Sequence, residues 1–512
     1  MKNIVICADG TGNAGRGTNV FKLYEAVDQT GHRLTPGLMP QVARYHDGVG
    51  TESLKWVRML TGATGWGLSR NVKQLYGWLA SLYAPGDRIF LFGFSRGAFT
   101  VRTLAGLIHA CGILDLGKYS TSEAFEADVK NAYREYRRGY NSWLTAIFHK
   151  TKKLDADRLA ELRSRFSVPI PEFQPDAQGK LIEFMGVWDT VDAVGLPLRA
   201  TNFVNRVIYA FKFPDRTLNA SVAHACHALA LDEERESFAP VLWDESKTED
   251  PKRIEQVWFA GVHSNVGGGY PRQGMSLVPF DWIMQKAEAP PHNLRFDPRL
   301  ISRYVTDVND KMYDSRAGLG VFYRWLPRDV QRLCADNRVT PQVHRSVFER
   351  IARNTDGYAP GSIPADPEVI SLSQSPAMTD AIRKLVRDHH GSQGPLLGRA
   401  TTQLRVGRWL YWLFVWGVLL TVFFMLKGFV MGPLDGTSTW GQVALDFTDT
   451  IVSSKWLGLT HKTLWPRPWL IAWLVVTLGL AIEADRQLDR GYWRFWHDDH
   501  MRLKLRKALG LG

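Results

Sequence analysis

The pentapeptide Gly93-Phe94-Ser95-Arg96-Gly97 is a complete G-x-S-x-G sequence. An apolar run, RIFLFGF, leads into it, and a run with helical spacing, AFTVRTLAGLIHA, follows it. In a tight strand-to-helix turn, small residues must flank the serine, and the turn raises the hydroxyl above the sheet. The pattern therefore predicts that Ser95 is a nucleophile that attacks an ester carbonyl. The alternative is a serine that only caps the following helix.

A serine nucleophile needs a base, and for this kind of turn the chain order is serine, acid, histidine. His263 ends the apolar run QVWFAGV and opens the glycine-rich segment SNVGGGY. We predict that His263 is the base; the alternative is a histidine with a purely structural role in a turn. His224 and His227 lie in a predicted helix, and His497 and His500 lie in a basic tail, so these four are weaker candidates.

The acid of such a triad orients the histidine, and it should follow a neighbouring strand. Asp189 comes directly after the apolar run LIEFMGVW, on the same predicted sheet edge as Ser95. We predict Asp189 as the acid, with Asp192 and Asp232 as alternatives, because a single aspartate after a strand is often a helix cap.

A tetrahedral intermediate also needs backbone amides that stabilise its oxyanion. One such donor follows the nucleophile in the chain, and the other lies in an early strand-to-helix loop. The amides of Arg96 and of either Gly10 or Thr11 are therefore the predicted oxyanion donors. The side chain of Asp9 is expected to hold this first loop in place.

These residues require a sheet whose strands end at one common edge. Short apolar runs bounded by turn residues predict strands, and stretches with an apolar stripe predict helices. Alternation of the two predicts an α/β fold of the hydrolase type, with a mostly parallel sheet flanked by helices and a helical insertion. The predicted strands cover residues 3–8, 41–46, 88–94, 181–188 and 253–262, and the predicted helices cover 19–27, 68–83, 96–111, 218–231 and part of 120–165.

The 512 residues are long enough for more than one domain. We expect a catalytic domain over 1–289, and a polar, partly helical elaboration or linker over 290–398. Residues 399–512 are expected to anchor the chain in a membrane, with one or two spanning helices at 409–426 and 469–482. Buried core helices are the alternative for these two runs, and an interfacial or re-entrant segment is a further alternative for the second.

Basic residues precede the first apolar run and follow the second. The positive-inside rule therefore predicts that both flanking segments are cytoplasmic and that the 432–465 loop lies outside. We expect a membrane protein, of the bacterial inner membrane, with its catalytic domain in the cytoplasm. The basic tail would contact anionic lipids.

The net charge of +12 could also indicate nucleic acid, but the sequence has no zinc-finger, helix-turn-helix or RNA-binding pattern, so we expect no nucleic-acid partner. Cys7, Cys111, Cys226 and Cys334 lie far apart, which excludes a disulfide-rich scaffold and the usual zinc spacings. We expect no metal.

A G-x-G-x-x-G at residues 10–15 suggests dinucleotide binding, but no helix follows directly and no acidic residue stands at the usual offset. We therefore expect no cofactor.

Six motifs carry a resemblance to a known family. They are ADGTGN at 8–13, YHDGVGT at 45–51, GFSRGAF at 93–99, GVWDTV at 186–191, ALALDEER at 228–235 and GVHSNVGGGY at 261–270. In this order they resemble the catalytic domain of type VI secretion phospholipase effectors, a branch of the α/β-hydrolases. The resemblance implies Ser95 as nucleophile, His263 as base and the acid near Asp189. It also implies lipid esters, phospholipids among them, as substrates.

The sequence as a whole predicts a membrane-associated serine esterase or lipase that works through an acyl-enzyme. The alternative from another class is a membrane-anchored scaffold that keeps the fold without activity. A dinucleotide-binding protein is the weaker rival.

Overall fold

In the computed structural model, Met1–Asp388 together with Arg502–Gly512 form one compact unit, and His389–Met501 form a second. The structure describes the whole chain except residues 11–16, 49–65, 139–156, 158–160, 163, 169–179, 192–215, 249, 318–324, 373–374, 431–464, 498–499 and 512. Asp192, Thr11 and the predicted external loop at 432–465 therefore fall wholly or almost wholly outside the described residues.

The first unit contains an eight-stranded sheet with the order β10-β9-β8-β7-β6-β3-β1-β2. Each pair of neighbours in it, over the residues described, is parallel. The fold is therefore α/β. The strands are β1 Asn3–Ala8, β2 Gln41–His46, β3 Arg88–Phe94, β6 Ile182–Trp188, β7 Val222–Ala230, β8 Ile254–Phe259, β9 Gln342–His344 and β10 Glu368–Ile370. A separate antiparallel pair joins β4 (Ile113–Leu114) to β5 (Phe166–Val168).

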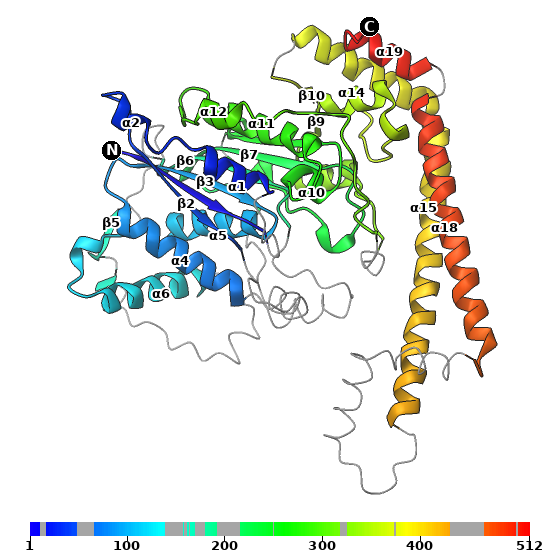
Figure 1. The fold of residues 1–512 in the computed structure, drawn as a ribbon, viewed down its shortest axis with the longest axis horizontal. Helices are drawn as coiled ribbons and strands as arrows, with labels where there is room; N and C mark the ends of the chain where they lie inside the picture. Colours follow the sequence, from blue (N-terminus) through cyan, green and yellow to red (C-terminus); the bar gives the residue numbers. More distant parts are fainter. Residues whose placement is uncertain are drawn as a thin grey trace, which may run out of the picture. The chain divides into compact units, whose positions relative to one another are not determined.

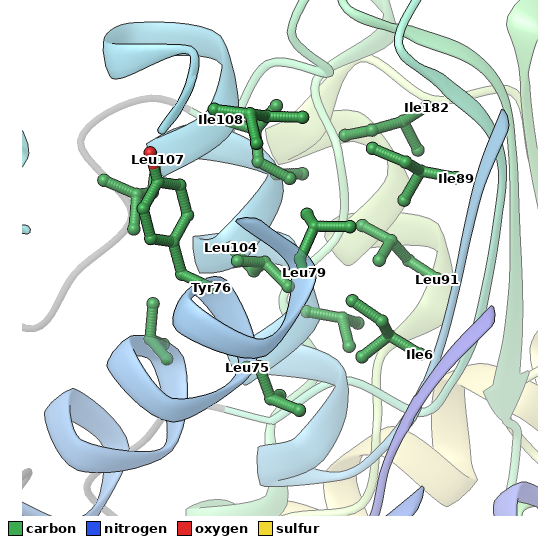
Figure 2. Close-up of a cluster of buried hydrophobic side chains, with 14 of the residues drawn as sticks. Ile6, Leu75, Tyr76, Leu79, Ile89, Leu91, Leu104, Leu107, Ile108 and Ile182 are labelled. Atoms are coloured by element: carbon green, nitrogen blue, oxygen red, sulfur yellow. The ribbon is translucent and has the colours of Figure 1, made fainter. Parts of the chain in front are cut away.

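Helices cover both faces of this sheet (Figure 1). The α-helices of the first unit, whether or not they lie on the sheet, are α1 Asn19–Ala26, α2 Gly31–Leu34, α4 Trp66–Leu82, α5 Arg96–Cys111, α6 Ser122–Arg138, α10 His263–Gly267, α11 Gly274–Glu288, α12 Pro298–Ile301, α13 Val330–Asn337, α14 Arg345–Arg353 and α19 Met501–Ala508. The apolar side chains of α4 and α5 pack on one face (Figure 2), where α6 packs against these two helices, and those of α1 and α11 pack on the other face. Alternate residues of each strand serve the two cores, since strand side chains point to opposite faces.

The strand order reverses between β1 and β3, because the chain runs from β1 to β2 on one side and returns to β3 on the other. In open α/β sheets, ligands bind at the carboxyl ends of the strands beside such a reversal. Ser95 follows β3 at this point, and Gly10 lies just after β1. The topology therefore brings the predicted nucleophile and the first loop to the same edge.

Most predicted elements are confirmed to within a few residues, including β1, β2, β3, α1 and α5. The predicted helix over 218–231 is wrong, because this segment is strand β7, between β6 and β8. Helices cover both faces of the sheet, so a central strand is apolar on both sides and loses the alternation that marks a half-buried strand. Its alanines then favour a helical interpretation.

The sheet also continues beyond residue 289, the predicted end of the catalytic domain. Strand β9 pairs with β8, and β10 pairs with β9. These two strands are only three residues long, and such short strands leave little periodic signal in a sequence. Part of the 290–398 segment is thus integral to the sheet.

The second unit consists of most of α15 (Pro376–Val430) and of α18 (Pro468–His497). Trp473 Nε1 donates to the Leu413 carbonyl at 2.8 Å, and His389 Nε2 contacts the Phe495 carbonyl, so the two helices run antiparallel. Both helices are long and apolar enough to cross a membrane, judged by length and composition. Only 11% of each apolar stretch is buried, which does not fit the core-helix alternative.

Candidate active site

Ser95 lies in a strained turn between β3 and α5. Its φ of 59° and ψ of −123° are a conformation that residues other than glycine rarely adopt. The flanking glycines are required by close packing: a Cβ at Gly93 would lie 2.6 Å from the Ala98 Cα, and one at Gly97 would lie 2.1 Å from the Ala8 carbonyl oxygen. The G-x-S-x-G pattern is therefore explained by the geometry of the turn.

The Ser95 side chain does not cap the helix that it precedes, so the alternative role considered for it is not seen. Its Oγ instead lies 2.8 Å from His263 Nε2. The Ser95 amide donates to the Trp188 carbonyl at 3.0 Å, which ties the turn to the end of β6. The serine is 7% exposed, so the hydroxyl is nearly buried beside the imidazole.

His263 begins α10, just past the carboxyl end of β8. Its Nδ1 lies 2.6 Å from Asp189 Oδ2, and its ring packs between the rings of Phe94 and Phe238. Because the carboxylate can only accept, Nδ1 carries the proton and Nε2 is left to accept the Ser95 proton. Burial lowers the pKa of His263, although Asp189 opposes the shift, and the ring is therefore neutral near pH 7.

Asp189 follows β6 directly, is fully buried, and has a φ of 37°. Its Oδ1 accepts from the Ala230 amide at 3.0 Å, and Arg328 donates to both oxygens, from Nη1 at 2.7 Å and from Nη2 at 2.9 Å. Burial alone would raise the pKa of this carboxyl, but Arg328 and His263 reverse the shift and hold it well below its usual value. Asp189 is therefore ionised.

Sequence reasoning missed Arg328. Besides Asp189, its guanidinium donates to the carbonyls of Ala230 and Phe238, and its side chain is 3% exposed. It comes from the 290–398 segment, 139 residues after its partner, where no motif marks it. Only a contact across the fold could have identified it.

Glu233 was also missed, although it lies within the ALALDEER motif. It is fully buried, accepts from the His263 amide at 3.2 Å, and forms a two-point ion pair with Arg235 at 2.8 Å. Burial opposes ionisation, but the hydrogen bonds and charge of Arg235 lower the pKa of Glu233 to about 2. This carboxylate fixes the backbone at the start of α10 and so the position of the imidazole.

The other predicted residues have different surroundings. Asp232 accepts from the Gly261 amide at 2.6 Å and from the Tyr358 hydroxyl at 2.8 Å, and no described contact joins it to His263.

In the first loop, the Gly10 amide donates to Asp9 Oδ1 at 2.7 Å. Asp9 Oδ2 accepts from Tyr45 and Thr18, so this side chain holds the first loop as expected. Arg96, whose amide is a predicted oxyanion donor, is the first residue of α5.

His224 and His227 lie on opposite faces of β7, because side chains alternate along a strand. His227 is buried and accepts from the Thr190 amide at 3.0 Å, next to Asp189. Burial lowers the pKa of His227 to about 3, so it is neutral and supports the turn after β6. His224 lies near the amino end of β7, beside Cys226 and Glu255, and these three are the described residues whose atoms could hold a metal ion.

Three comparisons with known proteins accompany this geometry. A family model described as "T6SS, Phospholipase effector Tle1-like, catalytic domain" matches residues 2–286, more than half of the chain. An uncharacterised protein of Saccharomyces cerevisiae, YEL023C, is 30% identical over 263 residues, and the match covers 46% of this chain and 32% of that protein. The chain thus spans less than two thirds of the length of this curated relative.

A crystal structure of an uncharacterised protein from Pseudomonas aeruginosa is also similar, at 18% identity and a TM-score of 0.31. The match covers 75% of this chain and 58% of the other. A likeness of this size carries no argument about the fold or the site.

Proposed function

The chain belongs to the family of Tle1-like catalytic domains of type VI secretion phospholipase effectors, and we propose that it is a serine hydrolase that cleaves carboxylic esters of lipids. Membership of this family supports a lipase-like hydrolase domain over the matched residues. The proposal adds the chemistry: Ser95 as nucleophile, His263 as base and Asp189 as the acid. The same proposal includes an α/β-hydrolase fold for the first unit.

One observation carries the proposal. The Ser95 hydroxyl, the His263 imidazole and the Asp189 carboxylate form a continuous hydrogen-bonded chain, with Oγ to Nε2 at 2.8 Å and Nδ1 to Oδ2 at 2.6 Å. They come in the order serine, acid, histidine and stand at the carboxyl ends of three strands. A serine held at positive φ with no role as a helix cap supports a functional reason for the strain.

In the proposed mechanism, His263 Nε2 takes the Ser95 proton while Oγ attacks the ester carbonyl. Asp189 stays ionised and stabilises the imidazolium that forms, as its lowered pKa requires. The imidazolium then protonates the leaving alcohol, and a water activated by His263 releases the acid from the acyl-enzyme. For the oxyanion we propose the Arg96 amide together with that of Thr11, since the Gly10 amide already donates to Asp9.

Membrane association is part of the proposal. Large apolar side chains are exposed along both helices of the second unit, among them Trp409, Trp416, Phe423, Trp469 and Val475. In water such a surface would be costly, whereas in a bilayer it is the expected one. We propose that residues 399–512 anchor the chain, in a bacterial inner membrane with the catalytic unit in the cytoplasm. Release of the chain from membranes by alkaline carbonate would contradict this anchoring.

The experiment that tests catalysis is covalent labelling of the purified full chain with a fluorophosphonate probe. We expect wild type to be labelled, and Ser95→Ala and His263→Ala to lose the label. His344→Ala is a matched control, because this half-buried histidine accepts from the Ser346 amide at the start of α14 and has no described contact with Ser95, Asp189 or His263. A folded wild type that neither labels nor hydrolyses a lipid ester would favour the scaffold alternative.

A further inference from the structure

A second group of titratable side chains lies away from the triad, near the amino ends of β7 and β8. His224 and Cys226 are two residues apart on β7 and so share one face of the sheet. Glu255 is the partner of Cys226 in the register with β8. His224 Nε2 lies 2.9 Å from Glu255 Oε1 and 3.9 Å from Cys226 Sγ. A nitrogen, an oxygen and a sulfur donor therefore converge.

The other side of the His224 ring is fixed by a second histidine. His224 Nδ1 lies 3.0 Å from His292 Nε2, and His292 Nδ1 lies 2.7 Å from Glu183 Oε1. Both end carboxylates are paired with a cation, Glu183 with Arg88 at 3.0 Å and Glu255 with Lys286 at 2.7 Å. The result is a chain of carboxylate, imidazole, imidazole and carboxylate.

Counting protons along this chain gives a definite result. It contains three hydrogen bonds, each of which needs one proton, and two neutral imidazoles supply only two. If His292 donates to Glu183 and His224 donates to His292, then the lone pair of His224 Nε2 faces the lone pairs of Glu255. This third hydrogen bond needs one more proton, and a metal ion bound to both atoms would take the place of that proton.

We propose that His224, Cys226 and Glu255 form a binding site for a divalent transition-metal ion, with Zn²⁺ as the ion that fits the donors best. An imidazole, a thiolate and a carboxylate are common zinc ligands, at about 2.0–2.3 Å from the metal. Calcium and magnesium, which prefer all-oxygen sites, do not suit this set. Three protein ligands leave the fourth tetrahedral position for water.

The surroundings support the assignment. Metal-bound histidines usually donate their second ring N–H to another acceptor, and here His292, backed by Glu183, is that acceptor. The side chains of His224 and Glu255 are 18% and 21% exposed, so an ion can reach these two donors from solvent, while Cys226 lies fully buried beneath them. Binding forms bonds to N, O and S and releases two protons, one from the Cys226 thiol and one from the His224 ring. The net charge of the cluster is unchanged by this exchange.

The site would crosslink β7 to β8, so its expected effect is on stability. The test uses the full-length chain, stripped with a chelator and titrated with Co²⁺, and needs no hydrolase assay, so it is independent of the proposed function. We expect one Co²⁺ per chain with a thiolate-to-cobalt absorption band in the near ultraviolet, displacement by Zn²⁺, and a higher melting temperature with Zn²⁺. Absence of the band in folded wild type would overturn the proposal.

Variants separate this site from adventitious binding. Cys226→Ala should lose the band and weaken binding by more than about 100-fold, and Glu255→Gln should weaken binding without loss of the fold. Cys334→Ala, which removes another buried thiol, should bind as wild type does. Lys286→Met should strengthen binding, because it frees Glu255 from a competing cation. Equal affinity in Cys226→Ala and Cys334→Ala would show that the cluster binds no metal.

Discussion

Two regions of the first unit contain a buried histidine between polar partners. They differ in the groups that end their series of hydrogen bonds. At the carboxyl edge the chain runs from Asp189 through His263 to a hydroxyl. A hydroxyl brings its own proton, so a neutral imidazole satisfies both bonds. At the amino ends of β7 and β8 the chain ends in a carboxylate on each side, and it needs one more cation. The first arrangement is suited to proton transfer and the second to holding an ion.

The largest expected effect is the loss of activity when Asp189, the proposed acid of the triad, is replaced. Asp189→Asn should lower kcat/KM for a soluble ester by about 10⁴-fold, because an amide no longer holds His263 in the tautomer that accepts a proton. Asp232→Asn is the matched control, since this carboxylate contacts Gly261 and Tyr358, and its effect should stay below about 10-fold. Similar losses in both variants would contradict the assignment of Asp189.

The next effect is a loss of stability when Arg328, the counter-ion of Asp189, is replaced. Arg328→Met leaves the buried Asp189 without a counter-ion and should lower the free energy of unfolding by about 3–5 kcal/mol. Arg383→Met breaks a two-point but exposed pair with Asp366 and should cost no more than about 1 kcal/mol. Chemical denaturation of the full chain in detergent measures both.

A double variant sharpens this result. Asp189→Asn combined with Arg328→Met removes both buried charges, so it should be more stable than Arg328→Met alone. If Arg328→Met is no more destabilising than Arg383→Met, the guanidinium does not compensate the buried carboxylate.

The smallest effect is a pH dependence that belongs to the first region. The pKa of Glu233 is lowered to about 2 in the folded state, so its ionised form stabilises the fold above its usual pKa, and this contribution is lost as pH falls towards 2. Between pH 5 and pH 3 we expect wild type to lose about 2 kcal/mol more than Glu233→Gln. Thermal unfolding of both proteins at these pH values tests the difference. Parallel curves would contradict it.

The same contrast explains what could be predicted from the sequence. Ser95 and His263 are marked by local patterns, because a tight turn demands glycines and a strand end precedes each residue. Arg328 carries no such mark, since its role depends on a partner 139 residues away. The second cluster was hidden by a specific error. In a helix, His224 and Cys226 would point in different directions, and only a strand places them on one face.

Arg328 lies beyond residue 286, where the match to the family ends, yet it neutralises the carboxylate of the proposed triad. A gene fragment ending at 286 would encode Ser95, Asp189 and His263 and still leave a buried negative charge without its counter-ion. The part of the chain that must stay together to keep Asp189 neutralised is therefore larger than the stretch that the family model matches. It extends at least through Arg328, and the pairing of β9 and β10 carries it to residue 370.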